Sequence, residues 1–271
     1  ITVQDTTDPV LAGVPADTTV ECDSVPSAAT PTASDNCDAD VNIAYGEVRT
    51  DGACVDTYTL TRTWTATDNC GNTDVQVQVI TVQDTTDPVL TGVPADITAE
   101  CNAIPAVASP TATDNCDSAV TIAFNETTTP GACPDAYTIT RTWTATDNCS
   151  NTDVQSQVIT VVDTTDPVLA GIPADVTAEC NAIPAIASPT ATDNCDSDVT
   201  ISFNETTTPG ACPDAYTITR TWTATDNCNN TDVQAQVITV VDTNAPELTG
   251  NAFTGTSGTN ACLVDAASLF S

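Results

Sequence analysis

Residues 137–146 read Tyr-Thr-Ile-Thr-Arg-Thr-Trp-Thr-Ala-Thr, and this stretch decides the fold class of the chain. Its side chains alternate between a row of threonines and a second row made of Tyr137, Ile139, Arg141, Trp143 and Ala145. A period of two residues is the signature of a β-strand, and threonine and aromatic residues favour strands. We expect the tryptophan row to face a core and the threonine row to face solvent or a second layer.

The sequence around this stretch contains further short alternating runs and no helical periodicity. Gly, Pro and Asn separate the runs, which is typical of strands joined by turns. We expect strands at residues 88–93, 97–101, 106–113, 120–126, 136–146 and 154–161. The pattern predicts an all-β chain built from β-sandwiches.

The same pattern recurs every 79 residues, because the phrase Ile-Thr-Val begins at Ile1, Ile80, Ile159 and Ile238. This period is too long for a solenoid unit and suits one small domain. An alternating run followed by Asp-Thr-Thr-Asp-Pro reads as a last strand that enters a linker. We therefore expect repeats at 5–83, 84–162 and 163–241, with residues 1–4 left from a preceding repeat and 242–271 forming a divergent module or a tail.

The composition excludes several classes of protein. The chain has 37 acidic and four basic residues, a formal charge of −33, and no histidine. Nucleic-acid binding needs a basic surface that neutralises phosphates, and four basic residues do not supply one. The strong negative charge also disfavours binding to anionic lipid. The absence of histidine removes both the commonest general base of enzymes and the commonest metal ligand. No apolar run approaches the roughly 18 residues of a membrane span. With neither an initiator methionine nor a signal-peptide pattern, we expect a mature fragment or an excised stretch.

Cysteines recur at four fixed offsets in each repeat, with Cys262 in addition. An even number in a small acidic domain indicates a disulfide framework formed in an oxidising compartment. A four-thiolate zinc site is the alternative, but the chain has no Cys-x-x-Cys knuckle. The three sets are Cys22, Cys37, Cys54 and Cys70; Cys101, Cys116, Cys133 and Cys149; and Cys180, Cys195, Cys212 and Cys228.

Four cysteines allow three pairings within a repeat. Cys133 and Cys149 flank the strand at 136–146, which spans about 36 Å, whereas bridged Cα atoms lie about 5.5 Å apart. Cys116 and Cys149 share the context Ala-Thr-Asp-Asn-Cys, so we expect them at one end of the sandwich and Cys101 with Cys133 at the other. The predicted pairs are Cys22–Cys54, Cys37–Cys70, Cys101–Cys133, Cys116–Cys149, Cys180–Cys212 and Cys195–Cys228.

Aspartates recur in the linkers and at strand ends. Oxygen-rich loops suit a hard cation such as calcium, although Asp and Asn also simply make turns. The last strand of one repeat delivers the linker to the end of the next, so we expect four aspartates to meet at each junction. The predicted ligand sets are Asp5, Asp8, Asp35 and Asp68; Asp84, Asp87, Asp114 and Asp147; and Asp163, Asp166, Asp193 and Asp226. At a fourth junction Ala245 replaces the second aspartate, so that site should be weak or absent.

Arginines precede the three tryptophans by two residues, as Arg62, Arg141 and Arg220. We expect a structural role, with the guanidinium over the indole and paired to a carboxylate such as Glu21, Glu100 or Glu179. A clamp for a sugar acid is the alternative. Paired carboxylates could also indicate a glycosidase, but interchangeable repeats without a cleft-forming insertion argue against an enzyme.

The motifs, taken in order, resemble hyalin-repeat-like (HYR-like) modules of the four-cysteine variety. These motifs are Asp-Thr-Thr-Asp-Pro, Pro-Ala-Asp-x-Thr-x-Glu-Cys, Ala-x-Asp-Asn-Cys, the strand motif of residues 137–146 and a closing Ile-Thr-Val. The resemblance covers residues 1–246 and extends to large secreted surface proteins of Bacteroidota, including gliding-type adhesins. It implies an immunoglobulin-like fold, secretion, and a role in adhesion or as a stalk.

Two functions remain. The first is a structural segment of a long extracellular cell-surface adhesin, stalk or filament, stapled by disulfides and stiffened by calcium. Its partners would be neighbouring repeats of the same longer chain, with identical chains in a surface filament as further candidates. The second is an array of glycan-binding modules, but each repeat has about one Trp and one Tyr, both on the core face. We favour the first, and the short proline-containing linkers predict a stiff extended rod.

Overall fold

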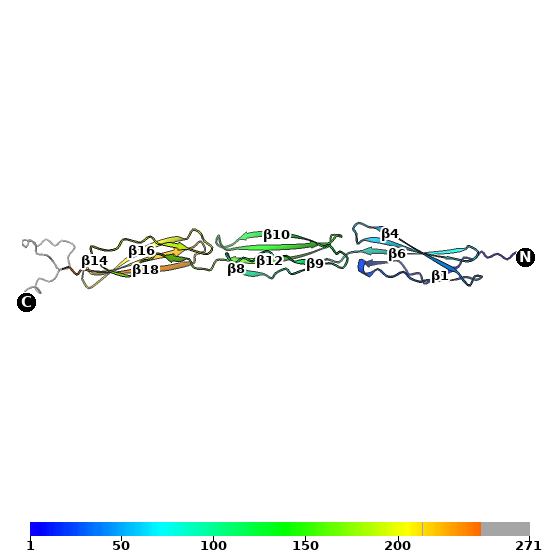
Figure 1. Ribbon diagram of the computed structural model, residues 1–271, viewed down its shortest axis with the longest axis horizontal. Helices are drawn as coiled ribbons and strands as arrows, with labels where there is room; N and C mark the ends of the chain where they lie inside the picture. The colour runs from blue at the N-terminus through cyan, green and yellow to red at the C-terminus, as the bar shows by residue number, and fades with distance from the viewer. Residues whose placement is uncertain (213, 245–271) are drawn as a thin grey trace, which may run out of the picture. The chain divides into compact units, whose positions relative to one another are not determined.

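The computed structural model describes residues 1–212 and 214–244 (Figure 1). These residues form strands and one short 3-10 helix, η1 (Cys22–Ser24), so the predicted all-β class is confirmed. Within the described part of the chain, no helix is long and apolar enough to cross a membrane. The predictions for Ala245, for Cys262 and for the remainder of the 242–271 tail lie outside the described residues, which end at Asn244.

The chain divides into two compact units whose boundary runs through the second repeat. One unit holds residues 1–96, 106–127 and 140–158. The other holds residues 97–105, 128–139 and the chain from 159 onward. The junction between the first and second repeats therefore lies inside one unit, and the junction between the second and third repeats lies inside the other.

The same order of six strands occurs three times. The first repeat contains β1 (Val10–Ala12), β2 (Thr18–Glu21), β3 (Thr32–Ser34), β4 (Asn42–Asp51), β5 (Tyr58–Thr67) and β6 (Thr73–Gln83). The second contains β7 (Val89–Thr91), β8 (Ile97–Glu100), β9 (Thr111–Thr113), β10 (Thr121–Pro130), β11 (Tyr137–Thr146) and β12 (Thr152–Val162). The third contains β13 (Val168–Ala170), β14 (Val176–Glu179), β15 (Thr190–Thr192), β16 (Thr200–Pro209), β17 (Tyr216–Thr225) and β18 (Thr231–Val241).

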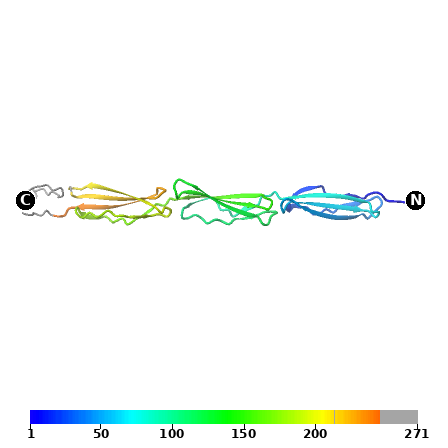
Figure 2. The same ribbon diagram turned by 90° about the horizontal axis from the view of Figure 1, so that it is seen from above.

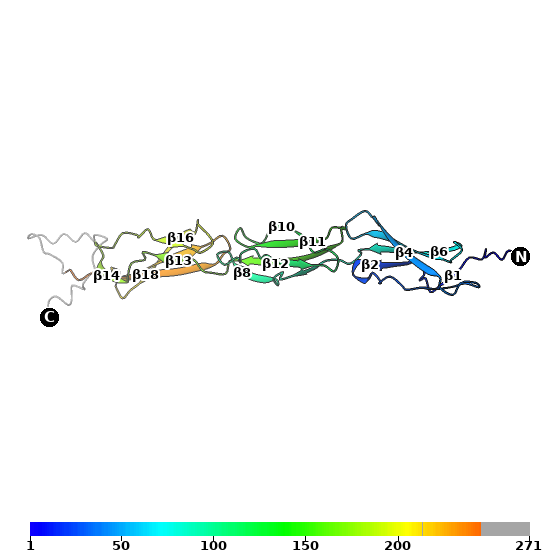
Figure 3. The same ribbon diagram turned by 45° about the vertical axis from the view of Figure 1, so that its right-hand side comes forward.

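Each repeat is a sandwich of a two-stranded and a four-stranded sheet. In the first repeat, β1 pairs with β3, and the larger sheet has the order β2–β6–β5–β4. Strands β4, β5 and β6 are antiparallel and lie side by side in Figure 2. Strand β2 runs parallel to β6 and lies beside it in Figure 3. The corresponding orders recur in the second and third repeats.

The six predicted strands of the second repeat are present, but the one expected at 88–93 is shortened to β7 (Val89–Thr91), and two others differ in length. The strand expected at 106–113 is reduced to β9, because Pro110 has no N–H to donate to a ladder. The strand expected at 120–126 continues as β10 to Pro130. A proline is tolerated there because β10 is an edge strand of its sheet.

The core of each repeat consists of two hydrophobic clusters. In the first repeat, Leu11 of β1 packs on Trp64 and Ala66 of β5, which joins the small sheet to the large one. The second cluster contains Ile80 and Val82 of β6, both almost fully buried. The tryptophan row of the strand motif therefore faces the core, as the alternation predicts.

A buried polar layer accompanies the two clusters on the inner face. Arg62 lies opposite Glu47 on β4 and Gln78 on β6. Its Nε donates to Glu47 Oε2 over 2.7 Å, and its Nη2 donates to the carbonyl oxygen of Pro26 over 2.9 Å. Gln78 is also buried and donates to the carbonyl oxygen of Ala16. The bond to Pro26 holds the loop after β2 against the large sheet, and the bond to Ala16 holds the loop before β2.

The arginines are buried and each pairs with a carboxylate, as a structural role predicts, but the predicted carboxylates are wrong, and the one cation–π contact found in the described part of the chain is that of Arg49 with Tyr58. The ion pairs are Arg62–Glu47, Arg141–Glu126 and Arg220–Glu205. Glu21 lies on β2, whose short ladder with β6 ends away from the arginine, whereas Glu47 is directly cross-strand. Antiparallel cross-strand neighbours are the closest side chains on one face of a sheet.

We predict that Trp143→Ala destabilises the second repeat by about 3–5 kcal/mol, because a buried indole leaves a large cavity. Trp143 is 2% exposed and stacks against Phe124 with ring centroids 5.3 Å apart. The matched control is Val154→Ala on the outer face of β12, where the side chain is 58% exposed. Calorimetry should show one unfolding component shifted by the first variant and little effect from the second. Equal shifts would contradict this assignment of the core.

Candidate functional site

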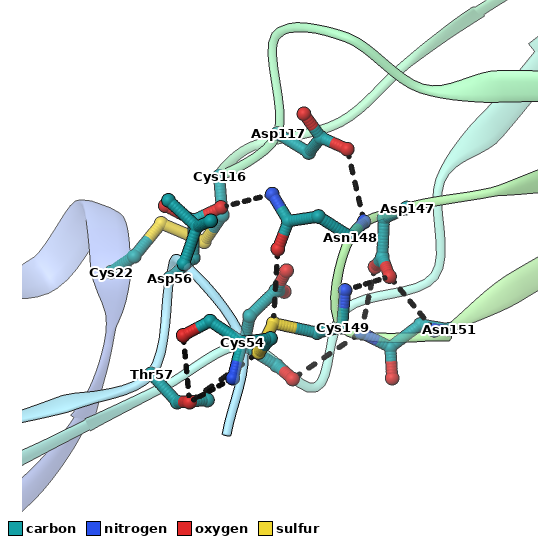
Figure 4. The surroundings of a disulfide bond; sticks show 12 residues. Cys22, Cys54, Asp56, Thr57, Cys116, Asp117, Asp147, Asn148, Cys149 and Asn151 are labelled. Carbon is teal, nitrogen blue, oxygen red and sulfur yellow. Dashed lines mark hydrogen bonds between the residues drawn. A yellow bond between two sulfur atoms is a disulfide. The ribbon is translucent and has the colours of Figure 1, made fainter. Parts of the chain in front are cut away.

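Two disulfides cross each described junction between repeats. Cys22 bonds to Cys116 and Cys54 bonds to Cys149, with Cα–Cα distances of 5.8 and 5.2 Å (Figure 4). At the second junction, the pairs are Cys101–Cys195 and Cys133–Cys228, with the same two distances. Each bond joins the end of one sandwich from which the chain leaves to the end of the next sandwich at which the chain enters.

The predicted pairing within repeats is therefore wrong. The structure replaces Cys22–Cys54, Cys101–Cys133, Cys116–Cys149 and Cys195–Cys228 with bonds between repeats. Cys37, Cys70 and Cys180 are thiols, so Cys37–Cys70 and Cys180–Cys212 are not formed. The expectation that Cys116 and Cys149 share one end was sound. The error was to treat each repeat as closed, because adjacent repeats bring two such ends together.

A tight turn holds Cys149 at the start of the second repeat. Asp147 Oδ1 accepts the N–H of Cys149 over 2.8 Å and that of Asn151 over 2.9 Å. Asp147 Oδ2 accepts a third bond from Asn151 Nδ2. Ser150 closes the turn with a φ of 76°, a left-handed conformation that non-glycine residues adopt at some cost. The local hydrogen bonds of one aspartate thus fix the direction of the cysteine.

A second turn holds Cys116 and reaches the first. Asp114 Oδ1 accepts the N–H of Cys116 over 2.7 Å. Asp117 Oδ2 accepts the N–H of Asn148 over 3.0 Å, which ties the two turns together. Asn148 Nδ2 donates across the junction to Asp56 Oδ2 over 2.6 Å (Figure 4). The two turns that carry Cys116 and Cys149 are therefore bonded to each other, and the Asn148–Asp56 hydrogen bond crosses the junction beside the disulfides.

The linker between the repeats is bonded on both sides. Glu21, at the end of β2, accepts the N–H and the hydroxyl of Thr85 over 3.1 and 2.6 Å. Asn151 Nδ2 donates to the carbonyl oxygen of Asp84 over 3.3 Å. Equivalent bonds recur at the second junction, from Thr164 to Glu100 and from Asn230 to Asp163. Short linkers fixed in this way keep the opposing cysteines within bonding distance.

Three aspartates gather at each of the two described junctions and at the corresponding end of the first repeat, with carboxylate oxygens within 4.8 Å of one another. The clusters are Asp5, Asp35 and Asp68; Asp84, Asp114 and Asp147; and Asp163, Asp193 and Asp226. Asp84 Oδ2 and Asp114 Oδ2 are buried and bond to no group in the described part of the chain. Asp84 and Asp114 therefore use Oδ1 to accept backbone N–H groups, and their buried Oδ2 atoms lie within the cluster without a donor.

Asp84 and Asp163 are the members of their clusters whose pKa values are raised. Asp84 is only 5% exposed, and this burial raises its pKa above the ordinary value. The negative charges of Asp114 and Asp147 raise the pKa of Asp84 further. Burial and two neighbouring aspartates raise the pKa of Asp163 in the same way. Oxygen donors, burial and like charge together fit a hard divalent cation.

The fourth aspartate of each predicted set, namely Asp8, Asp87 or Asp166, does not join its cluster. Asp87 Oδ1 and Asp166 Oδ1 accept the N–H groups of Thr152 and Thr231 over 3.3 Å, at the starts of β12 and β18. Three further positions were missed: Glu21 and Asn151, which hold the linker, and Asp56, which bonds across the junction. Their recurrence at 79-residue spacing was the available signal.

Family comparison places the chain. The model of the HYR-like domain with 4 cysteines matches residues 10–82, 90–161 and 170–240. These matches cover most of the chain, so the chain belongs to the family of HYR-like domains with four cysteines. The family resemblance noted in the sequence is thereby confirmed. Comparison with curated protein sequences found no significant match.

Solved structures give only distant likenesses. The crystal structure of mouse Cadherin-23 EC22-24 has 14% identity and a TM-score of 0.36, covering 87% of this chain and 99% of that one. Drosophila N-cadherin EC1-4 has 14% identity and a TM-score of 0.29, covering 87% of this chain and 76% of that one. Likenesses at this level carry no inference about ligand or function.

We predict that non-reducing peptide mapping recovers the four pairs that cross the junctions. Protein produced in an oxidising compartment should give peptides joining Cys22 to Cys116 and Cys54 to Cys149, with the corresponding pairs at the second junction. Reduction before digestion should abolish all four and serves as the control. Recovery of Cys101 joined to Cys133 would contradict the cross-linked junction.

Proposed function

We propose that the chain is a load-bearing segment of a long extracellular surface protein, an adhesin, stalk or filament of the kind found in gliding-type adhesins of Bacteroidota. The two disulfides across each junction carry this proposal. Disulfides form and persist in oxidising compartments, which supports an extracellular, cell-surface location. The repeat boundaries at 84, 163 and 242, and an extended rod without catalysis, belong to this proposal.

The cross-links create two covalent paths that bypass most of each repeat. In the second repeat, one path runs from Cys101 to Cys116, a distance of 15 residues along the chain. The other runs from Cys133 to Cys149, a distance of 16 residues. Fully extended, the two paths span about 50–58 Å at about 3.3–3.6 Å per residue. Without the disulfides, a 79-residue repeat spans about 260–280 Å. Tension along the chain would thus be carried by two short covalent paths that run side by side through each repeat.

Calcium at the junctions is a second part of the proposal. Asp84, Asp114 and Asp147 would hold one ion, and Asp163, Asp193 and Asp226 another, with the cluster of the first repeat as a third site. A bound cation would neutralise carboxylates that burial and mutual repulsion destabilise. It would also hold the linker, which carries Asp84, to the turns that carry Asp114 and Asp147. The disulfides and the cation would then stiffen the same joint.

Glycan binding by each repeat is less well supported. Trp64, Trp143 and Trp222 are each 1–2% exposed and cannot stack on a sugar. Tyr45, Phe124 and Phe203 are partly exposed, but each packs against its neighbouring indole with ring centroids 5.2–5.3 Å apart. The load-bearing role is better supported, because it accounts for the disulfides that recur at the junctions.

The test of the load-bearing role is single-molecule stretching of the chain from its two ends. The oxidised chain should show no unfolding step close to the length of a whole repeat, about 260–280 Å. After reduction, three steps of about that size should appear. The matched variant Cys22→Ser/Cys54→Ser should regain one long step while still oxidised, because only the first junction is opened. Whole-repeat steps in the oxidised parent would contradict the proposal.

The test of calcium is the stability of an Asp84→Asn/Asp163→Asn variant. In chelator at neutral pH, this variant should melt at a higher temperature than the parent, because it removes charges whose pKa is raised by burial. Groups with raised pKa penalise the fold above that pKa and are relieved as pH falls. The difference from the parent should therefore close as the pH approaches the ordinary aspartate value of 3.8. Added calcium should raise the melting temperature of the parent by more than that of the variant, which keeps only the cluster of the first repeat.

The control for this test is Asp40→Asn, which removes one negative charge at an exposed position. It should keep the calcium response and the pH profile of the parent. If the Asp84→Asn/Asp163→Asn variant responds to calcium as strongly as the parent does, the clusters are turn-forming carboxylates and bind no cation.

A further inference from the structure

The first repeat carries two cysteines whose counterparts are bonded in both later repeats. Cys37 and Cys70 lie 79 residues before Cys116 and Cys149. Those two cysteines receive the disulfides of the first junction, and Cys195 and Cys228 receive those of the second. Cys37 and Cys70 are exposed thiols, and together with Asp5, Asp38 and Asn69 they line one open pocket.

The surface around these thiols is already folded as it is in the joined repeats. Asp35 Oδ1 accepts the N–H of Cys37 over 2.8 Å, as Asp114 does for Cys116. Asp68 Oδ1 accepts the N–H of Cys70 over 2.9 Å, matching Asp147 and Cys149. Asp38 Oδ2 accepts the N–H of Asn69, which ties the two turns together. The docking geometry is therefore preformed.

One side chain differs, and it differs where the partner would be. In the joined second repeat, Asn148 Nδ2 donates across the junction to Asp56. In the first repeat, Asn69 Nδ2 donates instead to Asp38 Oδ1 of its own repeat, over 2.9 Å. The third repeat repeats the joined arrangement, with Asn227 donating to Asp135. Asn69 is thus in the arrangement of a junction that lacks its other half.

We infer that the Cys37–Cys70 end of the first repeat is a docking end for another repeat of this family, to which it becomes joined by two disulfides. The partner is a repeat that precedes residue 5 in the same polypeptide. It presents two cysteines 32 residues apart and an aspartate two residues after the second, as Cys22, Cys54 and Asp56 do. The inference rests on the cross-linked array of the proposed function and names its next member.

Residues 1–4 favour a partner in the same chain. They read Ile-Thr-Val-Gln, as do residues 80–83 at the end of β6. Ile80 and Val82 are 0% and 1% exposed, because β6 pairs with β2 and covers the core. Ile1 and Val3 match them in sequence and are fully exposed. Residues 1–4 therefore have the sequence of a last strand and lack the sheet that such a strand completes.

Each new bond forms by thiol–disulfide exchange with a small disulfide such as glutathione disulfide. The Cys37 thiolate attacks one sulfur of the small disulfide and releases one glutathione thiolate. The partner cysteine then attacks the mixed disulfide at the Cys37 sulfur and releases the second. Two protein thiols thus lose two electrons and two protons, which leave on two glutathione thiols. Cys70 forms its bond in the same way.

The experiment adds the missing repeat to the full chain. A copy of residues 84–158 is placed before Ile1, so that residues 1–4 complete a fourth repeat. Non-reducing peptide mapping should join the copy of Cys101 to Cys37 and the copy of Cys133 to Cys70. Alkylation of Cys37 and Cys70, expected without reduction in the 271-residue chain, should be lost in the extended chain. Restoring it by changing both copied cysteines to serine is the matched control.

Several outcomes would overturn the inference. If Cys37 and Cys70 stay reactive, or bond to each other, while Cys22–Cys116 and Cys101–Cys195 are intact, the docking end is wrong and the load-bearing proposal stands. If Cys22–Cys116 is absent from the parent itself, the proposed function fails first. The variant Cys22→Ser/Cys54→Ser of the 271-residue chain needs no added repeat, and it should leave Cys116 and Cys149 alkylatable. A Cys116–Cys149 bond in that variant would show that such an end closes on itself.

Discussion

The junction between repeats depends on two cystines that bond the end of one sandwich to the beginning of the next. Their formation requires four cysteine Cα atoms to be held in pairs 5.2 and 5.8 Å apart across the linker of residues 84–88. The turns of Asp114 and Asp147 hold one side, and η1 with the loop before β5 holds the other. Glu21 and Asn151 bind the linker, which keeps the paired cysteine Cα atoms at these distances.

The aspartates at each junction serve two purposes because a carboxylate has two oxygens. Oδ1 of Asp114 accepts backbone N–H groups and shapes the turn, which is the ordinary use of Asp at strand ends. Oδ2 of the same residue is buried beside the carboxylates of Asp84 and Asp147. The turn could form without a cation, but the cost of burying several charges together would remain. The raised pKa of Asp84 is the physical expression of that cost.

Each sandwich that the junctions connect has a core of two clusters and an ion pair with a buried arginine. Trp143 and Ile159 anchor two separate clusters, and the Arg141–Glu126 pair lies on the same inner face of the large sheet. A small domain of this size has a modest core, since it buries only part of its surface. Cross-links to both neighbours constrain the unfolded chain as well as the folded one. The stability of each repeat is therefore coupled to that of the repeats beside it.

The fold class, the 79-residue period and the three aspartates of each cluster could be predicted from the sequence, the last within sets of four. Alternation over residues 137–146 fixed which face is buried, because the period of a strand is a local property. The shared Ala-Thr-Asp-Asn-Cys context placed Cys116 and Cys149 at one end, and recurrence brought Asp84, Asp114 and Asp147 together. Only the tertiary structure decided that Cys116 bonds to Cys22 and that Glu126, not Glu100, pairs with Arg141. Both depend on which surfaces lie opposite one another in space, and separation along the chain does not specify that.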